Sequence, residues 1–175
     1  MVRFLLAGAL GIATVGAAQD IRGGRIPNWL TYGGLVAALL IRPLVLGWPG
    51  LKGGLIGMLA GGAIFFVFFV LGGMGGGDVK LMAAVAAWAG GAETMNILIA
   101  TAVAGGVLAL GAMLLRRQVR VTLLNTVELI RHHLTAGFKP HPELNIRDSR
   151  SMRIPFGPAI ALGTLYCLCR TFPWG

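Results

Sequence analysis

Long apolar runs separated by short polar segments extend along the whole chain. Most have a length near the roughly 20 residues that a helix needs to cross a hydrocarbon core of about 30 Å. Six can be drawn, at 3–19, 29–47, 51–71, 79–91, 94–115 and 154–170. The pattern predicts an all-α, polytopic membrane protein with about six transmembrane helices, forming a single membrane-embedded domain over residues 1–175.

One longer polar segment, residues 116–153, interrupts this pattern. The apolar positions within 119–134 fall on one broad helical face, and basic residues surround them. A basic amphipathic helix beside a membrane is typical of a segment that lies in the lipid interface. We therefore expect 116–153 to be a basic loop that carries an amphipathic helix.

Composition agrees with the membrane assignment, and charge orients the chain. Apolar residues make up 56% of the sequence, the mean hydropathy is +0.79, and the net charge is +9. If the loops after the first, third and fifth runs face the cytoplasm, they hold eleven of the fifteen Lys and Arg residues. The positive-inside rule then predicts a multi-pass protein of a bacterial inner membrane with both termini outside. The basic loop is expected to contact anionic membrane lipids, and not nucleic acid.

The N-terminal run has a second interpretation. Met1 to Ala18 has the basic start, apolar middle and small-residue end of a cleavable signal peptide. Arg22 and Arg25 follow it directly and would resist export, so we favour a retained span.

Small residues also recur within the runs. Gly53, Gly57 and Gly61 stand at every fourth position of the third run, and Gly105 and Gly106 are adjacent in the fifth. Small residues on one helical face let helix backbones approach closely inside a bilayer. Both sets are predicted to be helix-packing positions.

The fourth run is unusually short. From residue 79 to 91 it offers about 13 residues, or roughly 20 Å of helix, which is less than the hydrocarbon core. Either the helix continues through the Glu93 region, or its start, with Asp78, lies in a cavity below the cytoplasmic surface. Asn28 is predicted to cap the second span, after a short loop that ends in Pro27.

Two of the six acidic residues stand at the ends of apolar runs. Asp20 ends the first run and Asp78 begins the fourth, so the assigned topology puts both at the cytoplasmic edge. Ionisable groups at membrane depth are costly and indicate function by default. The other four are interpreted as solvated charges: Glu93, Glu128, Glu143 and Asp148.

Two carboxylates that meet would be able to hydrolyse a peptide bond. Like charges a few ångströms apart do not both ionise easily, so one retains a proton. One group then takes a proton from water while the other protonates a carbonyl oxygen. Gly75 and Gly77 would leave room beside Asp78 for a peptide backbone and allow positive φ angles.

Two other interpretations of these residues remain open at this stage. Asp78 suits a helix N-cap, and the glycines before it suit a flexible hinge. Alternatively, Asp20 and Asp78 form the proton relay of a small proton-coupled transporter, although the sequence has no evident inverted repeat.

The remaining candidate ligands predict neither a metal site nor a cofactor. The histidines lie in the basic loop and are interpreted as solvated, and the two cysteines stand on different faces of the last run; they are His132, His133, His141, Cys167 and Cys169.

Three motifs, taken together, carry a family resemblance. They are DIRGGRIPNWLT at 20–31, GGGDVKL at 75–81 and IPFGPAIA at 154–161. In this order and spacing they resemble the type IV prepilin leader peptidases, which are polytopic aspartic proteases of the GxGD type. By this resemblance Asp20 and Asp78 are the catalytic pair. The supporting residues that it implies are Gly75, Gly77, Lys80, Arg25, Pro27 and Asn28.

The resemblance implies an enzyme that removes the short basic leader from prepilin or pseudopilin proteins at the cytoplasmic membrane face, before assembly by a pilus or secretion machinery. Longer family members carry an N-terminal segment with paired CxxC motifs and also methylate the new terminus. This sequence has no CxxC motif. It is therefore similar to the short branch of the Flp/Tad systems, in which we expect no N-methyltransferase activity. A non-catalytic pilus-assembly scaffold is disfavoured, because both aspartates and both motif glycines are present.

Overall fold

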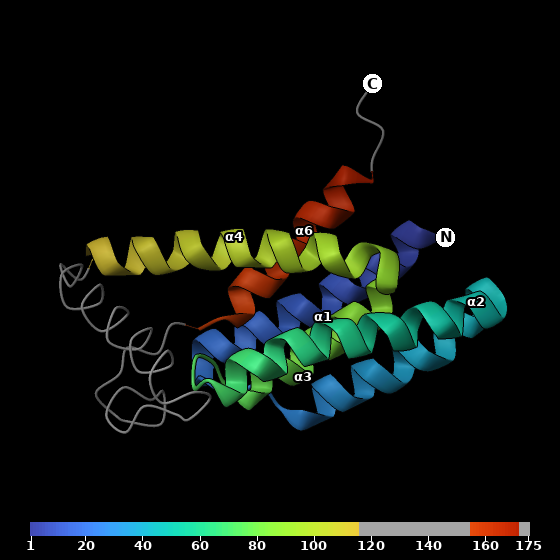
Figure 1. Ribbon diagram of the computed structural model, residues 1–175, viewed down its shortest axis with the longest axis horizontal. Coiled ribbons are helices and arrows are strands. Elements are labelled where there is room, and N and C mark those ends of the chain that lie inside the picture. The colour runs from blue at the N-terminus through green and yellow to red at the C-terminus, as the bar shows by residue number, and fades with distance from the viewer. Residues whose placement is uncertain (116–154, 172–175) are drawn as a thin grey trace.

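A computed structural model describes residues 1–115 and 155–171 of the chain. These residues form five helices and no strand, which confirms the all-α prediction. Figure 1 labels the helices α1 (Val2–Gly23), α2 (Asn28–Val70), α3 (Gly76–Ala89), α4 (Gly91–Leu115) and α6 (Gly157–Arg170). The predicted loop 116–153, with its amphipathic helix at 119–134, lies outside the described residues.

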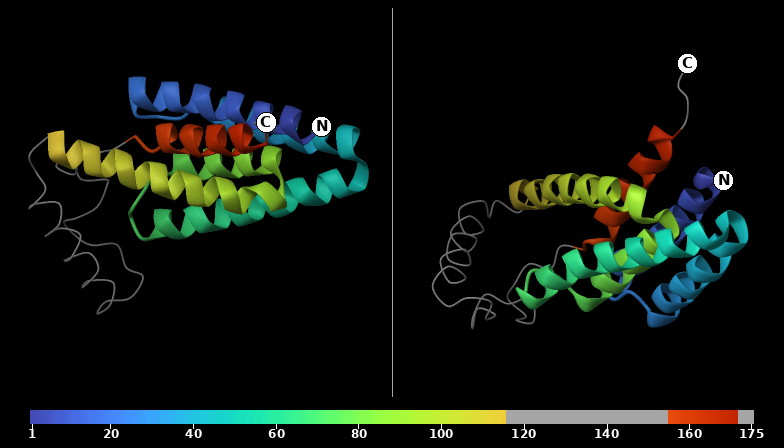
Figure 2. Two further views of the ribbon diagram at one scale, coloured as in Figure 1. Left: turned by 90° about the horizontal axis from the view of Figure 1, so that it is seen from above. Right: turned by 45° about the vertical axis from the view of Figure 1, so that its right-hand side comes forward.

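Helix α2 is a hairpin of two helical arms. Gly47 has φ 64° and ψ −156°, a conformation outside the helical region that glycine adopts without a Cβ clash. The chain reverses its direction there, as Figure 2 shows at the end of the bundle where the N-terminus also lies. The predicted runs at 29–47 and 51–71 are therefore the two arms of one long element.

Helix lengths identify a membrane protein. Among the described residues, α1, α2 and α4 are long and apolar enough to cross a membrane. Helices α3 and α6 have 14 residues each, which corresponds to about 21 Å. All six predicted runs fall on helices, but the count of six complete spans stays a prediction.

Helix α3 forms the centre of the bundle. Every residue from Leu81 to Ala89 except Ala83 is buried. It contacts α1, α2, α4 and α6, and Figure 1 shows it among them. Large side chains fully enclosed around it come from three other helices: Leu5, Leu6, Ile97 and Ile160. The short fourth run is thus a core helix with little contact with lipid.

Glycines let the second arm of α2 lie directly against α3. Gly54, Gly57 and Gly61 are buried, and Cβ atoms at these positions would touch Ala87, Ala86 and Met82 of α3. The prediction was right for Gly57 and Gly61 and wrong for Gly53, which faces the guanidinium of Arg42 instead. The reason is helical geometry, since a strict four-residue repeat drifts around a helix with 3.6 residues per turn.

The two adjacent glycines of α4 also differ in their surroundings. Gly105 is buried against Phe156 and Ala159, as predicted. Among the residues that the structure describes, none has an atom within 4 Å of the Gly106 Cβ position, so the prediction of a packing role was wrong there.

Gly57→Ala is expected to lower the free energy of unfolding by about 1–3 kcal/mol, the usual cost of overpacking a core. Its Cβ would overlap the carbonyl oxygen of Ala86 and come within 2.9 Å of Thr94 Oγ1. Denaturation of the purified protein in detergent measures the change. Gly106→Ala is the control and should stay within about 0.5 kcal/mol of the wild type. Equal stability of the two variants would contradict the close helix contact.

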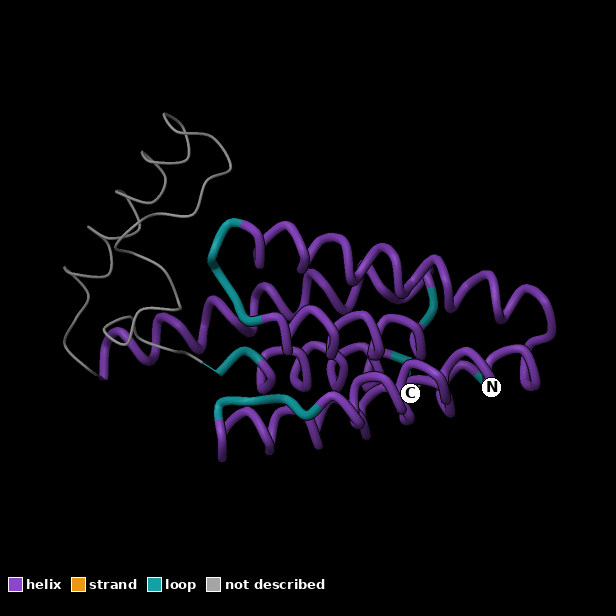
Figure 3. Tube along the Cα trace, turned by 90° about the horizontal axis from the view of Figure 1, so that it is seen from below, coloured by secondary structure: helices purple, strands orange, loops and turns teal. Residues whose placement is uncertain are grey.

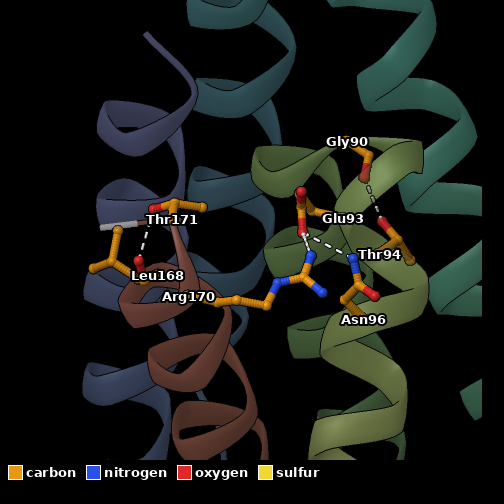
Figure 4. A network of polar contacts seen from close by, with 7 residues as sticks. All are labelled: Gly90, Glu93, Thr94, Asn96, Leu168, Arg170 and Thr171. Carbon is orange, nitrogen blue, oxygen red and sulfur yellow. Dashed lines mark hydrogen bonds and ion pairs between the residues drawn. The ribbon is translucent and has the colours of Figure 1, made fainter. Parts of the chain in front are cut away.

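An ion pair joins the start of α4 to the end of α6 (Figure 4). Glu93 Oε2 accepts hydrogen bonds from Arg170 Nη2 at 3.2 Å and from Asn96 Nδ2 at 3.0 Å. The sequence interpretation of Glu93 as a solvated loop residue was therefore wrong. Helix α3 ends at Ala89, Gly90 is its C-cap, and α4 begins at Gly91, so Glu93 lies in the first turn of α4 with a 21% exposed side chain.

Candidate active site

Three connections lie at one end of the bundle. Residues 24–27 lead into α2, residues 71–75 into α3, and residues 155–156 into α6. Figure 3 shows these teal segments together, opposite the end that holds the α2 hairpin. Each of the three carries part of one sequence motif, so the fold gathers the motifs at one end.

The packing of α1 against α3 brings the two aspartates to the same end of the bundle. The helices are antiparallel: Gly8 lies against the ring of Trp88, and a Cβ on Gly16 would come within 2.8 Å of Leu81. Asp20 is one turn beyond Gly16, and Asp78 is three residues before Leu81, so both aspartates follow directly from this contact in their helices. The predicted pair thus lies at the same end of two packed helices.

Asp20 lies in the last turn of α1, and its side chain reaches α6. Gly24 ends the helix in the left-handed conformation, with φ 59°, and its N–H donates to the Asp20 carbonyl at 2.8 Å. The side-chain Oδ2 of the half-buried Asp20 accepts a hydrogen bond from the Gly157 N–H at 2.9 Å. The carboxylate is therefore fixed by a residue 137 positions away in the chain.

Asp78 is the third residue of α3, and its carboxylate turns back to the start of the helix. Its Oδ2 accepts a hydrogen bond from the Gly75 N–H at 3.2 Å, and its Oδ1 is buried. The N-cap is Gly75, so the alternative that Asp78 itself is the N-cap was wrong. An acidic side chain in a first turn still stabilises the helix N-terminus.

The two motif glycines have different surroundings. A Cβ on Gly75 would come within 3.3 Å of Asp78 Oδ2, so this glycine does leave room beside the carboxylate. Gly77 faces Ile26 instead, where its Cβ would come within 3.3 Å of the Ile26 Cβ. The expected positive φ is absent from both; in this connection it occurs at Gly72.

Lys80 links the motif at 75–81 to the motif at 20–31. Its Nζ donates a hydrogen bond to Asn28 Oδ1 at 3.0 Å and lies 5.2 Å from the centre of the Tyr32 ring. Asn28 begins α2 but does not cap it; the N-cap is Pro27, which has φ −70° and an extended ψ of 140°. Arg25 is exposed on the same connection. The cross-link between Lys80 and Asn28 was not predicted, because the residues are 52 positions apart.

The contribution of α6 to this end of the bundle was also missed. Phe156 packs edge-to-face on Phe65 with 5.8 Å between ring centres, and it covers Gly105. Gly157 is buried, and its Cβ position lies 3.0 Å from the Ala17 Cα. The motif at 154–161 was visible in the sequence, but nothing in it specified Asp20 as the partner.

No group of three or more His, Cys, Asp or Glu side chains that could hold a metal occurs within residues 1–115 and 155–171. Cys167 is buried and Cys169 is exposed. His132, His133 and His141 lie outside the described residues.

Comparison with protein families identifies this chain. Residues 6–110 match the type IV leader peptidase family, and this range includes α2, α3 and most of α1 and α4. The chain therefore belongs to the type IV leader peptidase family and is a membrane protein of that family. Comparisons with curated proteins and with solved structures give no match.

Proposed function

We propose that this protein is an aspartic endopeptidase that removes the leader peptide from type IV prepilin-like proteins, of the Flp/Tad pilin or pseudopilin kind. Asp20 and Asp78 are its catalytic pair. The observation that supports this most directly is the antiparallel packing of α1 and α3, which brings the end of α1 with Asp20 and the start of α3 with Asp78 to the same end of the bundle. Membership of the leader peptidase family supports the type of reaction.

The proposed chemistry needs only the two carboxyl groups and a water molecule. The ionised carboxylate takes a proton from water, and the water oxygen attacks the carbonyl carbon of the scissile bond. The protonated carboxyl group gives its proton to the carbonyl oxygen. When the tetrahedral intermediate collapses, the C–N bond breaks and the proton held by the first carboxylate passes to the leaving amine. One hydroxyl of the intermediate returns its proton to the second carboxylate, which restores the singly protonated pair and releases the new carboxyl terminus. Like charge between neighbouring carboxylates favours the singly protonated pair that this sequence requires.

The substrate is a helix that already lies in the same membrane. A prepilin-like protein has a short basic leader before an apolar helix, so it reaches the site by lateral diffusion. The positive-inside distribution supports a cytoplasmic location for the end of the bundle with Asp20 and Asp78, in a bacterial inner membrane. This location matches the side on which a basic leader remains.

Reconstitution tests the proposal. The purified protein in anionic phospholipid vesicles is expected to cut a prepilin-like substrate once, just after the glycine that ends its leader, and mass spectrometry of the product identifies the new terminus. EDTA should leave the rate unchanged, because the proposed reaction uses no metal. Loss of cleavage with EDTA that added metal restores would contradict the metal-free mechanism.

A different outcome would favour the alternative function. Proton-dependent solute flux in the same vesicles, without cleavage of any prepilin-like substrate, would support the transporter interpretation and contradict the peptidase.

A further inference from the structure

We infer that Gly157, at the start of α6, is a positioning residue that fixes the Asp20 carboxylate for catalysis. The inference rests on the proposed function, because it assigns a role in the same reaction. It adds a third helix to a site that the two aspartates define on α1 and α3. Gly157 also lies beyond the range 6–110 that matches the family.

The first step of the argument is the hydrogen bond itself. The Gly157 N–H donates to Asp20 Oδ2 at 2.9 Å, in the usual range for such a bond. Gly157 is the first residue of α6, so its N–H is one of the four that a helix leaves without an internal acceptor. A carboxylate satisfies that donor and gains from the positive end of the helix dipole. One oxygen of Asp20 is thereby held, and the direction of the other is set.

The second step is steric. Cβ on residue 157 would come within 3.0 Å of the Ala17 Cα and within 3.1 Å of both Cβ and Oδ2 of Asp20. Two of these three atoms belong to α1 backbone or lie next to it, and they move only if the helices separate. Only glycine brings the start of α6 this close to the carboxylate.

The third step concerns Phe156, the residue that orients the Gly157 N–H. Phe156 precedes Gly157 and lies between two other helices: its ring meets Phe65 of α2 edge-to-face, at 5.8 Å and 69°, and covers Gly105 of α4. Phe65 is 4% exposed, so this contact belongs to the core. The orientation of the Gly157 N–H is therefore determined by α2 and α4 as well as by α6.

Steady-state kinetics separates positioning from simple stability. Gly157→Ala is expected to lower kcat for leader cleavage by about 10- to 100-fold, with KM within about twofold, because displacing a reacting group mainly affects the transition state. The matched control is Gly54→Ala, whose Cβ would come within 3.1 Å of Arg42 and 3.3 Å of Ala87 at the opposite end of α3. It is crowded to a similar degree and should retain the wild-type kcat. Wild-type kcat in Gly157→Ala, or an equal loss in Gly54→Ala, would overturn the inference.

A second variant covers the case in which Gly157→Ala does not fold. Phe156→Leu keeps apolar volume but removes the edge-to-face contact, so kcat should fall while KM is unchanged. Phe66→Leu is its control, because Phe66 is 54% exposed and should tolerate the change. A wild-type kcat in Phe156→Leu would show that the orientation of the Gly157 N–H does not affect catalysis, and would contradict the inference.

A stability measurement tests the contact independently of any activity. Thermal midpoints in detergent are compared for wild type, Gly157→Ala, Asp20→Ala and the double variant. If Gly157 binds Asp20, Gly157→Ala costs fewer degrees in the Asp20→Ala background, since the bond and the carboxylate clash are already gone. Equal costs in both backgrounds would refute the contact. If wild type cleaves no prepilin-like substrate, the proposed function fails and this comparison still decides whether Gly157 holds Asp20.

Discussion

Asp20→Asn and Asp78→Asn are each expected to reduce leader cleavage by at least about 10³-fold while the protein stays folded in the membrane. Asparagine has nearly the shape of aspartate, and its amide oxygen can still accept the N–H of Gly157 or Gly75. It cannot take a proton from water or give one to a carbonyl oxygen. Cleavage of a prepilin-like substrate by each purified variant in vesicles measures the loss.

The double variant gives a sharper test of paired action. If the two carboxyl groups share one reaction, Asp20→Asn with Asp78→Asn should be about as inactive as either single change, because groups that act as a unit are not additive. Glu93→Gln is the control. It removes a carboxylate from the opposite end of the bundle, where Glu93 pairs with Arg170, and should leave kcat unchanged. Full cleavage by either aspartate variant would refute the assignment.

Hydrophobic patterning was enough to predict the fold class. Apolar runs of membrane-spanning length carry the information locally, and each predicted run coincides with a helix or with an arm of α2. The start of α2 was also predicted to within one residue, since the expected loop ends at Pro27, but the cap is Pro27 and not the predicted Asn28. Local signals of this kind depend on residues within a few positions of one another.

The contacts of the candidate site were less predictable, because most of them join distant segments. Nothing in the sequence pairs Lys80 with Asn28, Gly77 with Ile26, or Gly157 with Asp20. Such pairs depend on which helix faces are in register. The same limit applies at Gly53, whose neighbour Arg42 lies on the other arm of the α2 hairpin.

Arg42 joins the α2 hairpin to α3 at the end of the bundle opposite the candidate site. Its side chain is 6% exposed, and it donates hydrogen bonds from Nε to the Gly50 carbonyl at 2.9 Å and from Nη1 to the Trp88 carbonyl at 2.6 Å. Trp88 is in the last turn of α3, where carbonyls lack helical partners and a cation is favourable. Arg42 thus joins both arms of the α2 hairpin to the end of α3. Asp78 lies at the other end of the same helix.

Arg42→Met is therefore expected to lower the free energy of unfolding by about 3 kcal/mol, because it leaves two carbonyls in a buried setting without their donor. Methionine keeps a long unbranched side chain, so the change reports mainly on the lost hydrogen bonds. Lys52→Met is the control: Lys52 is exposed over Trp48 on the same hairpin, and the same unit of charge is removed. That variant should stay within about 0.5 kcal/mol of the wild type. Denaturation of both in detergent measures the difference. Similar stability of the two variants would mean that Arg42 does not hold α3 to the hairpin. Helix packing alone would then hold α3, and Asp78 with it, in place.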